Sequence, residues 1–162
     1  MLVLENKRKH LLIREAIKED CLPIAKNMRE SDIREVWAAS KSGPLEAVRN
    51  GFLRSRLCWT GTLGDIPIWI GGVVSLGEAG GVGCPWLLGT DKIMQCPIQF
   101  LKSTKRYVDH IASQYDLLFN YVDARNTENI KWLQFVGFSI GKAVPYGVLG
   151  LPFHKFEMRG CG

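Results

Sequence analysis

The sequence lacks the cysteine patterns of metal sites and disulfide frameworks. Its five cysteines are an odd number, lie far apart, and never form a C-x-x-C pair. Free cysteine is among the most often buried residue types, so we expect reduced thiols that pack as small hydrophobic side chains, with Cys161 in a frayed tail. The sequence therefore predicts no metal site.

Long hydrophobic runs are also missing. The longest, residues 66–76, contains two glycines, a proline and a serine, and it is much shorter than the ~20 residues of a membrane-spanning helix. At the N-terminus the apolar residues 1–4 precede the basic run 7–9, which reverses the order found in a secretory signal. We expect neither a membrane span nor a secretory signal, and a cytosol-like setting.

No strong charge bias identifies a partner. Lys and Arg number 21 against 16 Asp and Glu, for a net charge of +5, which mildly favours anionic partners. The aromatic residues suit core packing better than a stacking platform, so nucleic acid is an unlikely partner. None of the three histidines has the neighbours of a hydrolase triad.

With 162 residues, 46% of them hydrophobic, the chain is long enough for one compact domain, 1–162.

Hydrophobic periodicity predicts an α+β protein. Residues 56–63 and 66–76 flank the two-residue turn Gly64-Asp65 and form an antiparallel hairpin. A long helix beginning at Pro97 connects two further strands, which must then lie parallel. We expect strands at 11–15, 56–63, 66–76, 84–90, 117–123, 138–143 and 153–159, and helices at 18–28, from Ser31 to Gly43, at 44–55, from Pro97 onward and at 130–136.

The last short helix has clear end signals. Asn126 or Thr127 can cap its N-terminus, because a side-chain oxygen there accepts a backbone N–H of the first turn. Gly137 can end it, because glycine readily adopts the left-handed conformation that follows many helices. We expect the strand at 117–123 to run parallel to 84–90 and to splay from it at one end.

This order of elements resembles the Gcn5-related N-acetyltransferase (GNAT) fold. Residues 121–138, YVDARNTENIKWLQFVGF, resemble the late strand-and-helix motif of that superfamily, in which an Asn lies eleven residues ahead of a helix-ending Gly-Phe, as Asn126 does here. The resemblance implies a mixed, mostly antiparallel sheet with helices on both faces and one splayed parallel strand pair. It also implies acetyl-CoA as the cofactor to be tested.

The second half of the chain contains a further set of motifs. They are WLLGTD at 86–91, Tyr115-Asp116, Asn120-Tyr121-Val122, Asn126-Thr127 and Gly137. Through these motifs the second half is similar to the internal virion proteins of short-tailed phages, which are themselves GNAT-like. This similarity implies a role in virion assembly or as a packaged binding protein, a phage or host protein as partner, and a location in the host cytoplasm or inside the virion.

The phosphate-binding loop of GNAT enzymes is not recognisable. Those enzymes hold a pyrophosphate on backbone N–H groups of an Arg/Gln-x-x-Gly-x-Gly/Ala loop that leads into the long helix. The corresponding residues 89–97, GTDKIMQCP, contain one glycine and one acidic residue, so we expect coenzyme binding to be weak or absent. The residues left to bind it are Lys92, Gln95, Cys96, Asn126 and Asn129.

The proton-transfer groups of the superfamily are also in doubt. The usual tyrosine, four residues before the Gly-Phe, is replaced by Leu133, which cannot donate a proton. The remaining candidate bases are Asp91 and, preferably, Asp123, which could equally be a turn-forming carboxylate ahead of the short helix.

Two main functions remain open. A binding protein with a degenerate acyltransferase site is favoured over an active acetyl-CoA-dependent N-acyltransferase that modifies a host or phage protein, and a nucleic-acid-associated factor is the third possibility.

Overall fold

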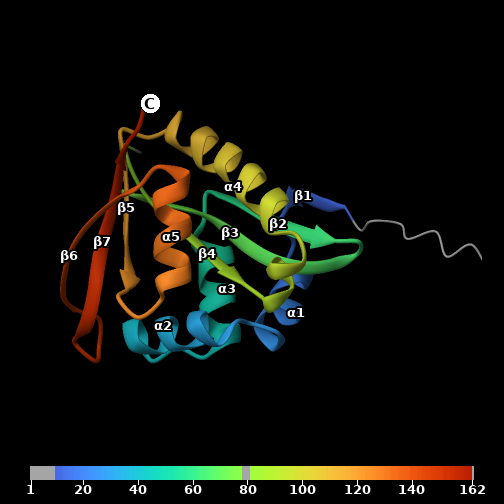
Figure 1. Ribbon diagram of the computed structural model, residues 1–162, viewed down its shortest axis with the longest axis horizontal. Helices are drawn as coiled ribbons and strands as arrows, with labels where there is room; N and C mark the ends of the chain where they lie inside the picture. Colours follow the sequence, from blue (N-terminus) through green and yellow to red (C-terminus); the bar gives the residue numbers. More distant parts are fainter. Residues whose placement is uncertain (1–9, 78–80, 162) are drawn as a thin grey trace, which may run out of the picture.

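The computed structural model describes residues 10–77 and 81–161. The expectations for the first nine residues, and the middle of the turn between residues 77 and 83, lie outside these ranges. The elements appear in Figure 1 in the order β1 (Leu11–Glu15), η1 (Lys18–Asp20), α1 (Cys21–Lys26), α2 (Glu30–Ser40), α3 (Pro44–Arg54), β2 (Leu57–Leu63), β3 (Ile66–Leu76), β4 (Val82–Gly89), η2 (Asp91–Gln95), α4 (Pro97–Ala112), β5 (Leu117–Asp123), α5 (Thr127–Val136), β6 (Ser139–Tyr146) and β7 (Leu151–Arg159).

The strands form one seven-stranded sheet in the order β1-β2-β3-β4-β5-β7-β6. Every neighbouring pair is antiparallel except β4 and β5, which are parallel. These two strands pair only at their first residues, where Val82 faces Leu117 and Gly83 faces Leu118. Beyond that point β4 and β5 separate, which confirms the splay expected from the sequence.

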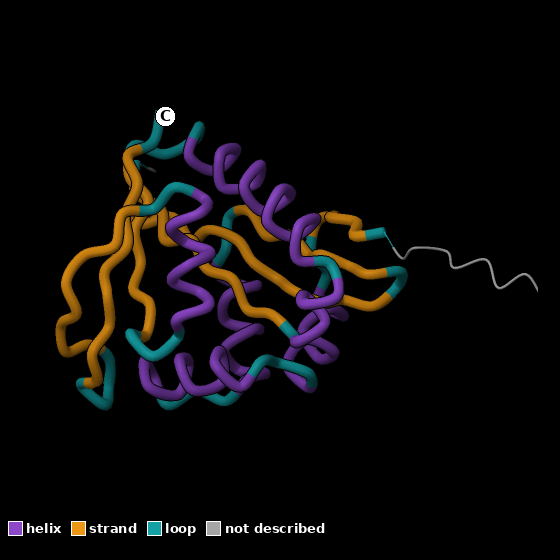
Figure 2. Tube along the Cα trace, viewed as in Figure 1, coloured by secondary structure: helices purple, strands orange, loops and turns teal. Residues whose placement is uncertain are grey.

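Helices cover both faces of this sheet. Figures 1 and 2 show α4 and α5 in front of the strands and α1 and α3 behind them. Helix α2 crosses below the sheet at the end where β4 and β5 stop, and it contacts both α3 and β5. The hydrophobic stripe of each amphipathic helix is buried against the sheet.

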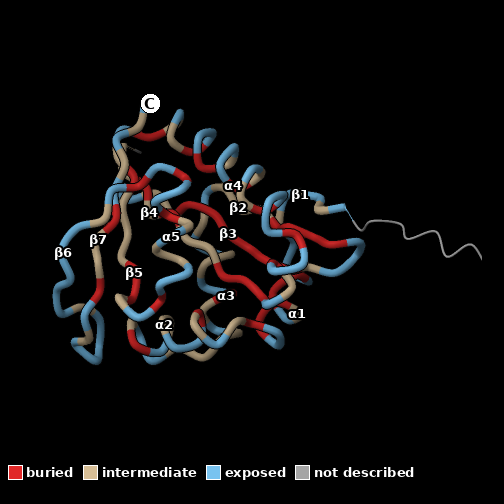
Figure 3. The backbone as a smooth tube through the Cα atoms, in the orientation of Figure 1, coloured by how far each residue is buried: buried red, intermediate tan, exposed pale blue. Residues whose placement is uncertain are grey.

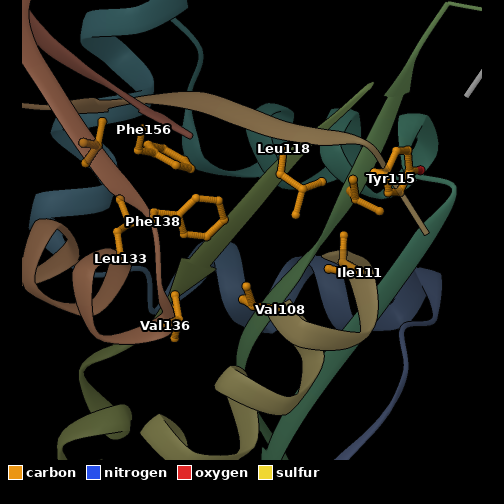
Figure 4. Close-up of a cluster of buried hydrophobic side chains, with 10 residues drawn as sticks. Val108, Ile111, Tyr115, Leu118, Leu133, Val136, Phe138 and Phe156 are labelled. Carbon is orange, nitrogen blue, oxygen red and sulfur yellow. The ribbon is translucent and has the colours of Figure 1, made fainter. Parts of the chain in front are cut away.

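The core lies on both faces of the central strands. Figure 3 shows buried residues along β3 and its neighbours, whereas the edge strand β6 is mostly exposed. One large cluster joins α4 and α5 to the sheet, and Figure 4 shows Val108 and Ile111 on α4, Leu133 and Val136 on α5, and Phe138 after it.

The first two expected helices differ from the structure at their ends. The helix expected at 18–28 is divided into η1 and α1, since the buried Asp20 accepts hydrogen bonds from Arg14, Thr60 and the N–H of Ile17, which fix a tighter first turn. It ends early because Met28 instead forms a β-bridge with Thr90. Helix α2 begins at Glu30, one residue before the expected start, and no side chain caps it.

The ends of α5 follow the sequence signals. Asn126 is the cap, since its Oδ1 accepts a hydrogen bond from the N–H of Asn129 at 3.3 Å. Gly137 has φ = 112°, in the left-handed region. The helix is three residues longer at its N-terminus than expected because Thr127, Glu128 and Asn129 already belong to its first turn.

Candidate functional site

The splay between β4 and β5 contains a cavity of about 540 Å³. Its walls come from the helices on both faces of the sheet and from the two diverging strands themselves. A parallel pair that stops exchanging hydrogen bonds leaves backbone groups and side chains facing an open space. The lining includes Glu35 on α2, Cys84 on β4, Asn120 and Tyr121 on β5, Asn129 on α5, and Tyr146 on β6.

Two carboxylates of α2 hold the separated ends of the strands. Asp32 Oδ2 accepts a hydrogen bond from the N–H of Gly89, the last residue of β4, at 2.9 Å. Glu35 Oε1 accepts one from the N–H of Asp123, the last residue of β5, at 2.8 Å. Residues three apart lie on one face of a helix, so α2 spans the splay and satisfies one strand end with each side chain.

A third contact crosses the splay nearer its closed end. Asn120 Nδ2, on β5, donates a hydrogen bond to the carbonyl oxygen of Pro85, on β4, at 2.9 Å. Its Oδ1 accepts the N–H of Tyr121. The ring of Tyr121 stacks on that of Tyr146, with ring centroids 4.1 Å apart and planes inclined by 14°. The cavity therefore has a rigid aromatic wall beside a side-chain bridge.

Glu35 is the titratable group that the cavity perturbs most clearly. Burial raises the pKa of its carboxyl group to about 8, and the charges of Asp32 and Asp123 act in the same direction. The hydrogen bonds from the N–H of Asp123 and from Asn126 lower the pKa, but burial is the largest effect and the net shift is upward. A carboxyl group that titrates near neutral pH in a cavity is suited to accept or donate a proton.

The carboxylates of Asp32 and Asp123, which lie near Glu35, each pair with an arginine. Asp32 is fully buried and pairs with Arg29 at 2.9 Å, and Asp123 pairs with Arg125 at 2.7 Å. Within the described residues, Glu35 forms no ion pair. Sequence reasoning missed Glu35, because a single Glu on an amphipathic helix carries no signal and only the packing of α2 below β5 brings it to the cavity.

Asp123, the base preferred from sequence, lies in a different arrangement. It is 1% exposed, accepts hydrogen bonds from the backbone and side chain of Arg125, and is not among the residues that line the cavity. Burial raises its pKa, but the contacts with Arg125 outweigh burial and leave the pKa below its ordinary value. This geometry is that of the turn-forming carboxylate, and catalysis by Asp123 stays a prediction.

The two asparagines proposed as cofactor ligands are close together. Asn126 is buried, caps α5, and places its Nδ2 3.4 Å from Asp32 Oδ1. Asn129 follows in the first turn of α5 and lines the cavity. Of the two, only Asn129 is positioned to reach a molecule in the cavity, since the side chain of Asn126 is used within the protein.

The remaining expected site residues lie on η2, between β4 and α4. Asp91 and Gln95 are exposed, Lys92 is half-buried, and Cys96 is buried in the cluster around Phe100. Burial raises the pKa of the Cys96 thiol, which therefore stays protonated at neutral pH. None of these residues lines the cavity, so the structure does not bring them together with Asn129.

Leu133, which stands where GNAT enzymes usually have a tyrosine, belongs to the hydrophobic core. Leu133 is 2% exposed and packs with Val136 and Phe138. The hydroxyl-bearing rings at the cavity are instead Tyr107, Tyr121 and Tyr146, and burial raises the pKa of Tyr107 and Tyr146. Strand alternation could have placed Tyr121 on one face of β5, but its partner comes from a distant strand.

Comparison of sequences gives one family match. Residues 68–143 match the model of the family described as "Bacteriophage T7, probable scaffold protein Gp13". This range covers β3 to the first half of β6 and includes the whole splay. No curated protein matches the sequence.

Comparison of structures covers nearly the whole chain. An acetyltransferase of the GNAT family from Streptococcus pneumoniae superposes with a TM-score of 0.64 at 12% identity, over 93% of this chain and 99% of the other. The chain has the GNAT fold. A spermidine N-acetyltransferase from Vibrio cholerae, in complex with CoA and spermine, gives 0.67 at 12% identity over 93% and 95%. The yncA protein of Salmonella typhimurium, with its cofactor acetyl-CoA, gives 0.65 at 12% identity over 92% and 93%.

The loop that would hold a coenzyme pyrophosphate in a GNAT protein does not fit that group here. The N–H of Ile93 donates to the carbonyl of Thr90 at 3.2 Å, and the N–H of Cys96 donates to the carbonyl of Ile93 at 3.1 Å. Pro97, the first residue of α4, has no N–H. The 3₁₀ turn therefore uses for its own hydrogen bonds the amides that a phosphate cradle would leave free, and Asp91 adds a negative charge beside it.

Two further kinds of site find no support in the described ranges. No group of three or more His, Cys, Asp or Glu side chains there could hold a metal ion. No helix of the described residues combines the length and the apolar character needed to cross a membrane.

Proposed function

We propose that the chain is a phage protein that acts in virion assembly or as a packaged binding protein, and that its GNAT fold serves to bind a phage or host protein. Its place of action is the host cytoplasm or the virion. The description of the family matched by residues 68–143 supports an assembly role. The observation that carries the proposal is the turn at η2, where the N–H groups of Ile93 and Cys96 already bond to carbonyl groups of the turn, whereas a GNAT enzyme needs an open phosphate cradle.

The chemistry of proton transfer supports the same conclusion. Leu133 is part of the core and has no group that could protonate a leaving thiolate. Asp123 is held below its ordinary pKa by Arg125, which makes it a weak base. Since each positioned acid or base contributes a factor of about 10² to 10⁴, the loss of these two groups lowers the expected turnover.

Two measurements test this proposal. Calorimetric titration with acetyl-CoA should give a Kd weaker than about 100 μM, which corresponds to a binding free energy of at most about 5.5 kcal/mol. Co-sedimentation with purified phage particles or procapsids should bring the chain down with them. A low-micromolar Kd, or a chain that stays in the supernatant, would contradict the assembly function.

One observation favours a second candidate, an N-acyltransferase. Glu35 faces the cavity, has a pKa of about 8 and forms no ion pair within the described residues. In its ionised form it could take a proton from an amine that enters the cavity. Acetylation of a panel of peptide and polyamine substrates tests this candidate. Activity that is lost in Glu35→Gln and retained in Asp123→Asn would assign the base to Glu35, and the reverse result would assign it to Asp123.

A further inference from the structure

The surface formed by η2 and the outer face of α4 combines exposed apolar side chains with unpaired cations. We define the α4 surface by Lys92, Met94, Ile98, Lys102 and Arg106. Met94 is 68% exposed and Ile98 is 66% exposed, which are large values for apolar side chains of this size. They lie in η2 and the first turn of α4, respectively.

The cations follow the same side of the helix. Ile98 and Lys102 are one turn apart, and Arg106 is one turn further on. Lys92, Lys102 and Arg106 form no ion pair within the described residues. Another cation of α4, Lys105, is paired with Asp109 at 3.2 Å. Asp91 is exposed on η2 and adds one negative charge, so the three cations leave the net charge of this surface positive.

The surface is also hollowed at one side. Arg106 borders a shallow pocket of about 420 Å³ between α4 and β1, with Ile13, Ser103, Tyr107 and His110 as the other lining residues. An apolar side chain placed there would contact Ile13 and Tyr107, while a neighbouring carboxylate could reach Arg106. Exposed apolar residues bordered by polar ones are typical of protein-binding surfaces.

We propose that the α4 surface binds an acidic segment of a partner protein that also carries apolar side chains. This inference rests on the proposed binding function and names the chemistry of the partner. Charge complementarity selects an acidic segment, and the exposed Met94 and Ile98 select protein over nucleic acid, because a phosphate backbone offers them no apolar contact.

The test uses an array of overlapping peptides from the virion proteins encoded with this chain. The full-length chain should bind peptides that are acidic and contain apolar residues, and binding should weaken as salt is raised. The double variant Lys102→Glu/Arg106→Glu should bind these peptides at least about tenfold more weakly. Ile98→Ser should also weaken binding, which a purely electrostatic contact would not show.

A matched control separates the surface from total charge. Lys131→Glu reverses a charge on the exposed side of α5 and should leave peptide binding unchanged. Thermal unfolding of each variant confirms that it is folded, as expected for exposed positions. Equal binding by the double variant, no bound peptide, or a preference for a labelled oligonucleotide over every peptide would each overturn the inference.

Co-sedimentation distinguishes this inference from the function on which it rests. If the wild type sediments with phage particles and the double variant does so equally well, the α4 surface is not the docking site, but the assembly function stands. If the wild type fails to sediment, the assembly function fails, whatever the peptide array shows. Loss of sedimentation in the double variant alone supports both.

Discussion

Replacing Glu35 with Gln isolates the contribution of one half-buried carboxyl group at the cavity to stability. The glutamine has the same shape, and its carbonyl oxygen can still accept the N–H of Asp123 that Glu35 Oε1 accepts at 2.8 Å. The variant therefore keeps the link between α2 and the end of β5 and removes only the ionisation. Its stability relative to wild type should change with pH.

The direction follows from the two pKa values. Glu35 has an ordinary value of 4.5, and burial raises the pKa to about 8 in the folded chain. Between these values the folded state binds one more proton than the unfolded state, so wild-type stability falls as pH rises. Each pH unit in this window costs about 1.4 kcal/mol, and the loss from pH 4.5 to pH 8 reaches up to about 4 kcal/mol.

Urea unfolding at pH 5, 6, 7 and 8 measures the effect. Glu35→Gln should be close to wild type at pH 5 and should become progressively more stable than wild type toward pH 8. Glu46→Gln removes the same charge from an exposed position of α3 and should follow the wild-type profile, because solvent surrounds that side chain in both states. Parallel profiles for wild type and Glu35→Gln would refute the reasoning.

Three further variants test local features of the fold. Asn126→Ala removes the cap of α5 and should lower the free energy of unfolding by about 1 kcal/mol in urea titration; no loss would mean that the cap is dispensable. Gly147→Ala should lower the free energy of unfolding by more than about 1 kcal/mol, since Gly147 has φ = 73° and a Cβ there would lie 2.7 Å from Ala39 Cα. Gly150→Ala is the matched control: Gly150 has φ = 62° but open space around it, so this variant should lose less stability in the same assay. Arg125→Ala removes the partner that lowers the pKa of Asp123. The lowered pKa stabilises the folded state above the unfolded pKa, and this stabilisation is lost as the pH falls through the folded pKa. The variant should therefore lose stability at neutral pH and show a flatter acid profile below about pH 4.

Local sequence signals determined most of the elements. The hairpin around Gly64-Asp65 forms as expected because two apolar runs and a glycine-containing turn are sufficient to specify it. The cap at Asn126 and the left-handed Gly137 were likewise predictable, since both depend on residues within one helical turn. The parallel pairing of β4 and β5 followed from the helix between them, because a crossover of that length permits few alternatives.

The candidate site depended on contacts that no local pattern contains. Glu35 lies 88 residues before Asp123, and only the passage of α2 below the splayed strands joins them. The pKa of Glu35 is raised and that of Asp123 is lowered, because burial without a cation favours the neutral carboxyl group and an adjacent Arg125 favours the charged one. Residue types and spacing specified the GNAT-like order of elements, whereas tertiary packing decided which carboxyl group faces the cavity and whether the amides of η2 are free.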